Sequence, residues 1–357
     1  MSWQYDSRVK IKKVSIDSKD TRGLVVSDIH LRLPKTDELM AIEQSLVERI
    51  SKLNKYKHAV LVLNGDVFEM WEQTSQSAQE IIDAYQDLTK AIAEFANTKG
   101  HTVYFTVGNH DEKINQDKSY LKSIQKSWHA TVCDKLLMSF ENTTIMFEHG
   151  HEYDPYNQSS TGGATHGREL VQKTLPKLQK NMPTLFNGIN DVINRGYLPS
   201  FVLSGLVYGL IVRFVFPLTL VVTLALYFTS GDKRLIWAFL LVWLMTLFVI
   251  VVVDSLLRFI AHRALGGGSH FMKNIEKSEK KTHYDYLALG HTHLGGVWDE
   301  EGYVYANSGC NDRVALERIG WLGVMKFDYF LKLGGLEIDF SKKRPLSYHQ
   351  ELRPLVK

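Results

Sequence analysis

The stretch GLVVSDIH at residues 23–30 ends an apolar, β-branched run on two polar side chains, Asp28 and His30. Three later stretches repeat this pattern: Gly65-Asp66, Gly108-Asn109-His110-Asp111 and Gly290-His291-Thr292-His293. Apolar runs bounded by turn residues are typical of buried strands in an α/β protein. Because polar side chains at strand ends meet at one edge of a sheet, where such folds place their chemistry, we interpret the four stretches as one site.

Apolar runs and helical periodicities give a coarse map of the chain. Strands are predicted at residues 9–16, 23–27, 59–63, 102–107, 144–147, 284–289, 302–306, 321–327 and 331–340. Two amphipathic helices are predicted at 36–54 and 75–98. Because strands alternate with helices early and cluster late, we expect an α/β fold with two sheets face to face and helices outside, a four-layer α/β/β/α sandwich.

Length and charge limit the classes of function. With 357 residues the chain is long enough for one large α/β domain plus an insertion, or for two modest domains. A net charge of +3 gives no global basic field, so we expect no nucleic-acid partner. Cys133 and Cys310 form no CxxC pattern and are expected to be reduced thiols. The first 30 residues lack the apolar segment of a signal peptide.

Two uncharged apolar runs occupy the middle of the chain. Phe214–Ser230 has no charged residue over 17 positions and Leu235–Val253 has none over 19, close to the length that spans a bilayer. The polar turn 230–234 separates them. Buried core helices are the alternative, but neither run has an amphipathic stripe. The sequence predicts a transmembrane hairpin, preceded by Tyr197–Val212 as a shallow in-plane segment or, alternatively, a further span.

The flanking charges predict how this hairpin is oriented. More lysines and arginines lie before and after the hairpin than at its turn, which carries Lys233 and Arg234. The positive-inside rule then places both flanking parts of the chain in the cytoplasm. We predict a main domain formed by residues 1–153 and 282–357. An inserted helical lid with the hairpin would occupy 154–281.

The polar clusters offer the ligands of a metal site. Side chains at i and i+2 of a strand point the same way, so Asp28 and His30 can hold one ion, and His291 and His293 have the same spacing. Asp66 is the natural carboxylate to bridge two ions. Oxygen and imidazole donors suit manganese first, with iron, zinc or magnesium as alternatives. Two neighbouring divalent ions can bind and activate a phosphate group.

With His149-Gly150-His151 added, the five clusters resemble the calcineurin-like metallophosphoesterases in order and type. The resemblance covers about residues 20–155 and 282–340. It implies one ion on Asp28, His30 and His293, a bridge at Asp66, and a second ion on Asn109, His149 and His291. It also implies that His110 contacts a phosphate oxygen or protonates the leaving group, with Asp111 orienting it.

The stretch 65–71 is similar to a Gly-Asp-hydrophobic-Phe-Glu-x-Trp stretch of the UDP-2,3-diacylglucosamine diphosphatases of lipid A synthesis. Those enzymes also carry a helical lid between their His-Gly and Gly-His-x-His motifs, where this chain has its insertion. They typically have arginine at the position of His110, and their lid caps the site without spanning the membrane. The similarity implies a lipid-linked phosphate substrate.

Several further residues have two interpretations each. His151 and Asp154 either orient the ligand His149 or belong to a plain loop. Arg32 and Arg313 either clamp a phosphate or face solvent. The basic stretch 168–180 is either a solvated face or a patch that binds an anionic lipid surface.

These features predict a membrane-anchored, two-metal phosphoesterase acting on a phosphate or pyrophosphate, in a lipid such as a UDP-diacylglucosamine-like molecule. A soluble substrate, such as a cyclic nucleotide or phosphoprotein, is the first alternative, with the hairpin only an anchor. A membrane scaffold without catalysis is the second, but all seven expected ligand positions are filled. The expected partners are the lipid bilayer and the substrate, and the sequence does not determine an oligomeric state.

Overall fold

A seven-stranded sheet carries the first three polar clusters. In the computed structural model, the described residues are 11–71, 76–154, 211, 213–264, 275, 284–300, 303–319 and 325–355. The strand order is β11 (Asn311–Ile319), β12 (Met325–Asp339), β2 (Arg22–Val26), β3 (Ala59–Asn64), β4 (His101–Thr106) and β5 (Thr131–Cys133), and β13 (Leu346–Pro354) pairs with β12. The strands β2 to β5 run parallel, so the loops after β2, β3 and β4 leave at the same edge.

A six-stranded sheet carries the other two clusters. Its strand order is β1 (Ile11–Ser15), β6 (Lys135–Phe140), β7 (Thr143–Phe147), β8 (Tyr286–Leu289), β10 (Tyr303–Asn307) and β9 (Gly296–Glu300). The strands β7, β8 and β10 are parallel, although more than 130 residues separate β7 from β8 in the sequence. This pairing brings the loops after residues 147 and 289 together.

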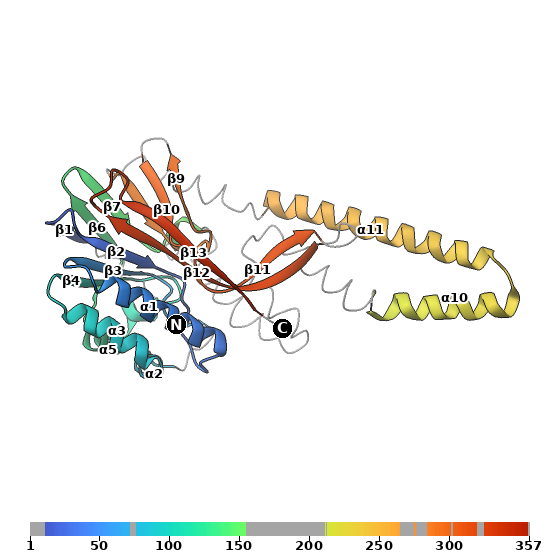
Figure 1. Ribbon diagram of the computed structural model, residues 1–357, viewed down its shortest axis with the longest axis horizontal. Coiled ribbons are helices and arrows are strands. Elements are labelled where there is room, and N and C mark those ends of the chain that lie inside the picture. Colours follow the sequence, from blue (N-terminus) through green and yellow to red (C-terminus); the bar gives the residue numbers. More distant parts are fainter. Residues whose placement is uncertain are drawn as a thin grey trace. The chain divides into compact units, whose positions relative to one another are not determined.

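Helices cover one face of the seven-stranded sheet (Figure 1). They are α1 (Asp37–Leu53), α2 (Ala78–Ala84), α3 (Gln86–Asn97), α4 (Lys113–Gln116) and α5 (Lys118–Trp128), and a short 3₁₀ turn follows at His151–Tyr153. The helix α1 begins where the sequence predicts. The Thr36 hydroxyl accepts the Leu39 N–H at 3.3 Å, and Asp37 and Glu38 occupy the first turn.

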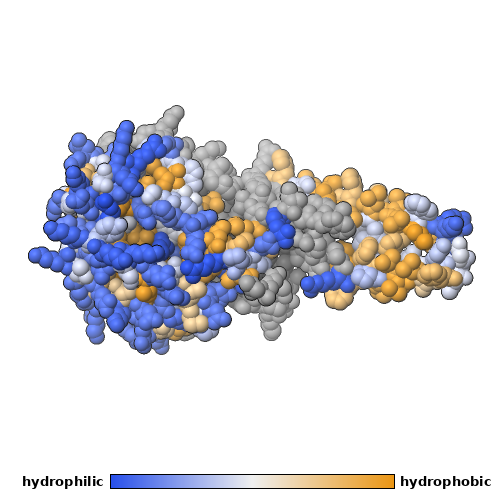
Figure 2. All heavy atoms as spheres, in the orientation of Figure 1, coloured by the Kyte–Doolittle hydropathy of each residue, from blue (hydrophilic) through white to orange (hydrophobic). Residues whose placement is uncertain are grey.

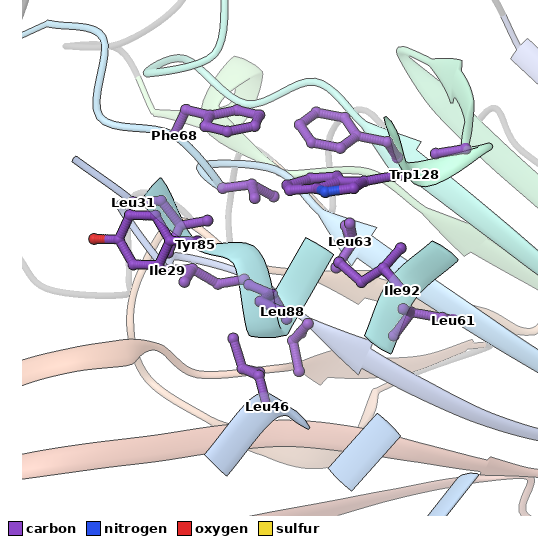
Figure 3. Packing of buried hydrophobic residues seen from close by; sticks show 14 of the residues in the cluster. Ile29, Leu31, Leu46, Leu61, Leu63, Phe68, Tyr85, Leu88, Ile92 and Trp128 are labelled. Atoms are coloured by element: carbon purple, nitrogen blue, oxygen red, sulfur yellow. The ribbon is translucent and has the colours of Figure 1, made fainter. Parts of the chain in front are cut away.

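The main core lies between these helices and the sheet. Figure 3 shows Leu61 and Leu63 of β3 facing Leu46, Leu88 and Ile92 of the helices. The Trp128 ring at the end of α5 is fully buried and stacks on Phe68 at a centroid distance of 5.4 Å. Phe68 belongs to the loop that carries Asp66, so the core fixes that loop from behind.

A second core contains side chains from both sheets. Its buried members include Val25, Val60 and Val62 of the seven-stranded sheet, and Leu136, Ile145 and Phe147 of the six-stranded sheet. Because alternate residues of a strand face opposite sides, Leu61 and Leu63 point to the helices while Val60 and Val62 point to the other sheet. Both faces of β3 are thus apolar, as the uninterrupted run 59–63 predicts.

The α/β class and most predicted elements of the main domain are confirmed. The predicted helix 75–98 is wrong as a single element, because the chain bends at Tyr85 (φ −103°, ψ 59°) and forms α2 and α3. The two predicted strands 321–327 and 331–340 are one long strand from Met325, with residues 321–324 outside the described part. The elements that were not predicted include the strands β5, β6, β9, β11 and β13 and the helices α4 and α5. The four-layer arrangement stays a prediction.

Two long apolar helices follow residue 212. They are α10 (Phe216–Ser230) and α11 (Arg234–Ala264), joined by the polar turn that the sequence predicts. Gly231 ends α10 in a left-handed conformation (φ 67°), and its N–H donates to the Tyr227 carbonyl. The Trp243 indole N–H of α11 donates to the Thr219 hydroxyl of α10 at 3.2 Å. Figure 2 shows hydrophobic residues over the surfaces of both helices.

The chain divides into two compact units. The first comprises Met1–Thr174, Lys273–Arg313 and Leu331–Lys357, and the second comprises Leu175–Met272 and Val314–Phe330. All predicted metal ligands belong to the first unit. The predicted domain boundaries at 154 and 282 stay a prediction. The basic stretch 168–180 and the segment Tyr197–Val212, apart from residue 211, lie outside the described residues.

Candidate metal centre

The five polar clusters lie at the carboxyl ends of five strands. Asp28 follows β2, Asp66 follows β3, and Asn109 follows β4. His149 follows β7, and His291 with His293 follows β8. The backbone N–H groups of Asp28 and His30 donate to the carbonyls of Gly65 and Asp66, which ties the first two loops together.

Two groups of side chains converge among the predicted ligands. Asp28, His30 and His293 each offer a ligand atom, and these atoms lie within 4.8 Å of one another. Asp66, His149 and His291 form a second group with the same spread. In the first group His293 Nε2 lies 3.2 Å from Asp28 Oδ1, and in the second His149 Nε2 lies 2.9 Å from Asp66 Oδ2.

The two groups are neighbours. His149 Nε2 lies 4.0 Å from Asp28 Oδ1, so the second group reaches the carboxylate of the first. Asn109 is buried, and its Oδ1 has no hydrogen-bond partner within the described parts of the chain. A buried amide oxygen normally has a partner, so this orphaned atom fits an oxygen ligand for a cation.

The electrostatics of the pocket favour positive charge. Burial alone would raise the pKa of Asp28, but the imidazoles of His293 and His149 outweigh it and lower the pKa to about 2. Burial would lower the pKa of His149, but the carboxylates of Asp66 and Asp28 raise it to about 9. Buried carboxylates that remain ionised need cations, and divalent metal ions supply them. The donor set and its charge therefore fit a metal centre.

Five of the seven predicted ligands have a left-handed backbone. The residues and their φ angles are Asp28 (50°), His30 (53°), Asp66 (50°), His291 (65°) and His293 (61°). This conformation costs a residue with a side chain about 1–3 kcal/mol, and it persists where surrounding contacts hold it. At Asp28 such contacts include the Asn311 N–H, which donates to its carbonyl at 3.0 Å. The strain turns side chains of separate loops toward one pocket.

Two glycines of the motifs allow the carboxylates to approach. A Cβ atom at Gly108 would lie 2.2 Å from Asp66 Oδ1, and one at Gly290 would lie 2.7 Å from Asp28 Oδ2. Neither contact is tolerable for a carbon atom. The glycines in Gly108-Asn109 and Gly290-His291 are therefore required by the close packing of the loops, independently of any ligand role.

Hydrogen bonds fix the orientation of the imidazoles. His149 Nδ1 lies 3.1 Å from the Asn64 carbonyl, which selects the tautomer with Nδ1–H and leaves Nε2 for a metal. His291 Nε2 lies 3.0 Å from Asp154 Oδ2, which leaves Nδ1. Asp154 thus contacts the ligand His291, and its predicted contact with His149 stays a prediction. The hydroxyls of Ser27 and Ser308 lie 2.6 Å apart beside Asp28, and Ser27 Oγ donates to its Oδ2.

Glu69 is the acidic partner of His110. Its Oε2 lies 2.7 Å from His110 Nδ1 and 3.3 Å from His30 Nδ1, and the three side chains form a third group of possible metal ligands. The indole of Trp71 stacks on the His110 ring at 4.3 Å. Sequence reasoning missed Glu69 as a site residue. The available signal was its place in the stretch 65–71, three residues after Asp66.

The observed hydrogen bonds of the Asp111 carboxylate go to backbone groups, and its predicted role in orienting His110 stays a prediction. Its carboxylate accepts the backbone N–H groups of Phe68 at 2.8 Å and of Val67 and Gly108 at 3.2 Å. Burial and the charge of Asp66 raise the pKa of Asp111 to about 7. Through these hydrogen bonds Asp111 joins the loop after β3 to the loop after β4. The His110 backbone N–H in turn donates to Asp66 Oδ1 at 2.8 Å.

Two predicted phosphate clamps lie at the edge of this site. Arg32 Nη1 donates to the His30 carbonyl at 3.1 Å. Arg313 Nη1 lies 4.0 Å from Glu38 Oε1 on α1. Both contacts are compatible with a structural role. His151 lies beside His149 at a centroid distance of 5.7 Å.

A family model agrees with this centre. The model for the calcineurin-like phosphoesterases matches residues 21–205, more than half of the chain. The chain belongs to the calcineurin-like phosphoesterase family. It is therefore a metal-dependent phosphoester hydrolase. The clusters that carry the sequence resemblance are the ones that the structure gathers. The comparison with curated proteins gives no match.

Solved structures of low sequence identity are also similar to the chain. A predicted phosphoesterase from Streptococcus pneumoniae has 10% identity and a TM-score of 0.28, with 92% of this chain and 97% of that one covered. A vacuolar protein sorting 29 from Cryptosporidium parvum has 10% identity and a TM-score of 0.31, with 94% and 98% covered. A dimetal phosphatase from Danio rerio has 12% identity and a TM-score of 0.36, with 89% and 95% covered.

Proposed function

We propose that the protein is a membrane-anchored, dinuclear-metal phosphoesterase that hydrolyses a phosphate or pyrophosphate bond in a lipid-linked substrate, such as a UDP-diacylglucosamine-like molecule. One observation carries the proposal. Two long apolar helices, α10 and α11, interrupt a phosphoesterase sequence between ligands of the same metal centre, His149 and His291. An enzyme anchored in this way meets substrates at the bilayer surface.

The chain's residues divide into two ligand sets. One ion would be held by Asp28, His30 and His293 and the other by Asn109, His149 and His291, with Asp66 as the bridge. Two bound divalent ions would polarise the phosphate, activate the attacking water and offset charge in the transition state. Manganese is our first candidate. Iron, zinc and magnesium are alternatives for the same oxygen and nitrogen donors.

His110 would act next to the ions. Burial would lower the pKa of His110, but the charges of Glu69 and Asp66 raise it to about 10. A protonated imidazole can donate to a phosphate oxygen or give its proton to the leaving group. Glu69 and the stacked Trp71 would hold the ring in place, because one contacts its Nδ1 and the other covers its face.

The helix lengths support a membrane hairpin. The apolar helical segments are Arg213–Ser230, with 18 residues, and Arg234–Leu257, with 24. At about 1.5 Å per residue they extend about 27 and 36 Å, against a hydrocarbon core of about 30 Å. Slight thinning of the bilayer accommodates the shorter helix, and tilt accommodates the longer one. The hydroxyls of Thr219, Thr229 and Thr246 donate to carbonyls of their own helix, so they need no water.

The charges support one orientation. Lys233 and Arg234 are exposed at the hairpin tip, whereas more basic residues flank the two outer ends in the sequence. By the positive-inside rule the metal centre would lie on the cytoplasmic side. The substrate phosphate would then be presented from the cytoplasmic leaflet.

The test is hydrolysis by the purified full-length protein, reconstituted in vesicles with manganese. We expect it to cleave bis(p-nitrophenyl) phosphate and to prefer a long-chain UDP-diacylglucosamine over its short-chain, soluble analogue. Asp66→Ala should lower turnover at least about 100-fold and reduce the bound manganese, because a bridging ligand is lost.

Each alternative has its own outcome. Equal activity on the long-chain and short-chain substrates would show that the hairpin is only an anchor and that the substrate is soluble. Absence of hydrolysis with every phosphoester, together with unchanged manganese binding by Asp66→Ala, would rule out the proposed chemistry.

A further inference from the structure

Lys332 is a buried lysine in the catalytic unit. It lies on β12, where its side chain is 6% exposed. Its neighbours Leu331 and Leu333 both belong to the core between the helices and the sheet. Because successive strand residues face opposite sides, Lys332 points away from that core, toward the loop that carries His293.

Within the described parts of the chain, the ammonium group of Lys332 has one partner. Lys332 Nζ donates to the His293 carbonyl at 2.6 Å. Among the described residues, no carboxylate lies within ion-pair distance of it, whereas Lys35 pairs with Glu43 and Lys135 with Glu148. An ammonium has three donors, and a buried charge without a counter-ion is unfavourable. Lys332 therefore keeps hydrogen-bonding capacity and charge that the described residues do not satisfy.

The register of β12 places this charge beside the metal centre. Leu336 of β12 pairs with Val25 of β2, and the antiparallel order continues toward the carboxyl end of β2. Lys332 thus lies beyond the last pair, at the level of the loop with Asp28 and His30. Its partner His293 also contacts Asp28, with Nε2 and Oδ1 3.2 Å apart.

We propose that Lys332 is an anion-binding residue of the substrate site, where its unused donors bind a phosphate oxygen next to the metal centre. The proposal rests on the proposed phosphoesterase function. A phosphate oxygen would supply the counter-ion that the described residues do not offer at this position, and charge-assisted hydrogen bonds to phosphate are the strong ones. Lysine serves such sites as a point charge. Lys332 would therefore favour substrates with an additional anionic oxygen, phosphomonoesters and diphosphates, over diesters.

The test uses a ligand that is not hydrolysed. Methylenediphosphonate has a carbon between its phosphorus atoms, so its binding to the manganese-loaded full-length protein can be measured by calorimetry. Lys332→Met should weaken its affinity roughly 10- to 100-fold, as expected for one charged hydrogen bond. Manganese content should be unchanged. Lys90→Met is the control, because Lys90 is 77% exposed on α3 and should leave the affinity unchanged.

A second variant separates the charge from the contact with His293. Lys332→Gln retains a donor for the His293 carbonyl but carries no charge, so it should also weaken the affinity. If Lys332→Met fails to fold, the affinity of Lys332→Gln is the test. Unchanged affinity in these variants would overturn the proposal. Loss of manganese together with affinity would also overturn it, because Lys332 would then only support the His293 loop.

Two further comparisons locate the bound anion and separate this proposal from the proposed function. If the Lys332 variants bind orthophosphate and methylenediphosphonate with equally reduced affinity, Lys332 contacts the phosphoryl group on the metals. If the variants lose affinity for methylenediphosphonate alone, Lys332 contacts a second phosphoryl group. If the wild type hydrolysed no phosphoester but bound methylenediphosphonate through Lys332, the proposed function would fail and the anion site would stand.

Discussion

Glu69 and Asp111 are both buried carboxylates near His110, and their partners differ. Glu69 Oε2 contacts the imidazoles of His110 and His30, and its Oε1 accepts the Trp71 N–H, whereas the Asp111 carboxylate accepts three backbone N–H groups. A carboxylate that faces a side chain in the pocket can affect chemistry. A carboxylate that gathers backbone donors holds loops together. The two residues should therefore respond to substitution in different ways.

We predict that Glu69→Ala lowers turnover by about 10- to 100-fold while the protein stays folded, because His110 loses the group that orients and charges it. The loss should be larger for an alkyl phosphate than for a p-nitrophenyl ester, since the poor leaving group needs the proton. Steady-state kinetics with both substrates, together with manganese content, provide the measurement. An equal loss on the two substrates would contradict a leaving-group role for His110.

Asp111→Asn is the matched comparison. We expect it to lower the free energy of unfolding by about 2–3 kcal/mol, because the amide presents a donor to backbone N–H groups that need acceptors. In thermal and urea unfolding, Asp111→Asn should be less stable than Glu69→Ala. If Glu69→Ala were the less stable variant, Glu69 and not Asp111 would be the residue that holds the loops together.

At the scale of elements, the break between α2 and α3 comes from tertiary contacts. The sequence predicts one helix because Ile81, Ile82, Leu88 and Ile92 keep a helical spacing across it. Tyr85 gives α3 no side-chain cap. Glu43 of α1 instead accepts the Leu88 N–H at 3.2 Å, and the Tyr85 hydroxyl donates to the Arg32 carbonyl. Neither contact can be seen in local periodicity.

The carboxylate of Glu43 should therefore contribute more to the stability of the protein than an ordinary glutamate on a helix. We predict that Glu43→Ala destabilises the protein by about 2 kcal/mol, because α3 loses a cap and the partner of Lys35 is removed. Glu48→Ala, an exposed glutamate on the same helix, should change stability by less than about 0.5 kcal/mol. Chemical denaturation measures both variants, and equal effects would refute tertiary capping.

The parts of the fold that could be predicted are those whose signal is local. Apolar runs placed β2, β3, β4, β7 and β8, and each delivers the motif that follows it. The mixed β13, with its half-exposed pattern, and the short α4 lack such a signal. In the site, the sequence predicts the types of the ligand residues and their spacing. The pairing of Glu69 with His110 and of Asp154 with His291 could not be predicted, since it depends on how distant loops meet, although the stretch 65–71 did mark Glu69 itself.

At the scale of the whole molecule, the hairpin tip provides the test of membrane topology. The native thiols Cys133 and Cys310 are both buried, so they give a low background for labelling. We predict that a membrane-impermeant maleimide labels Lys233→Cys from the side opposite the catalytic unit, because two helices of spanning length place the tip across the bilayer. Lys90→Cys, exposed on α3, should be labelled only from the catalytic side. Sealed vesicles of both orientations, with and without detergent, distinguish the two sides. Labelling of both positions from the same side would mean that α10 and α11 do not cross the membrane as a pair, and the substrate would then have to reach the metal centre without a bilayer anchor.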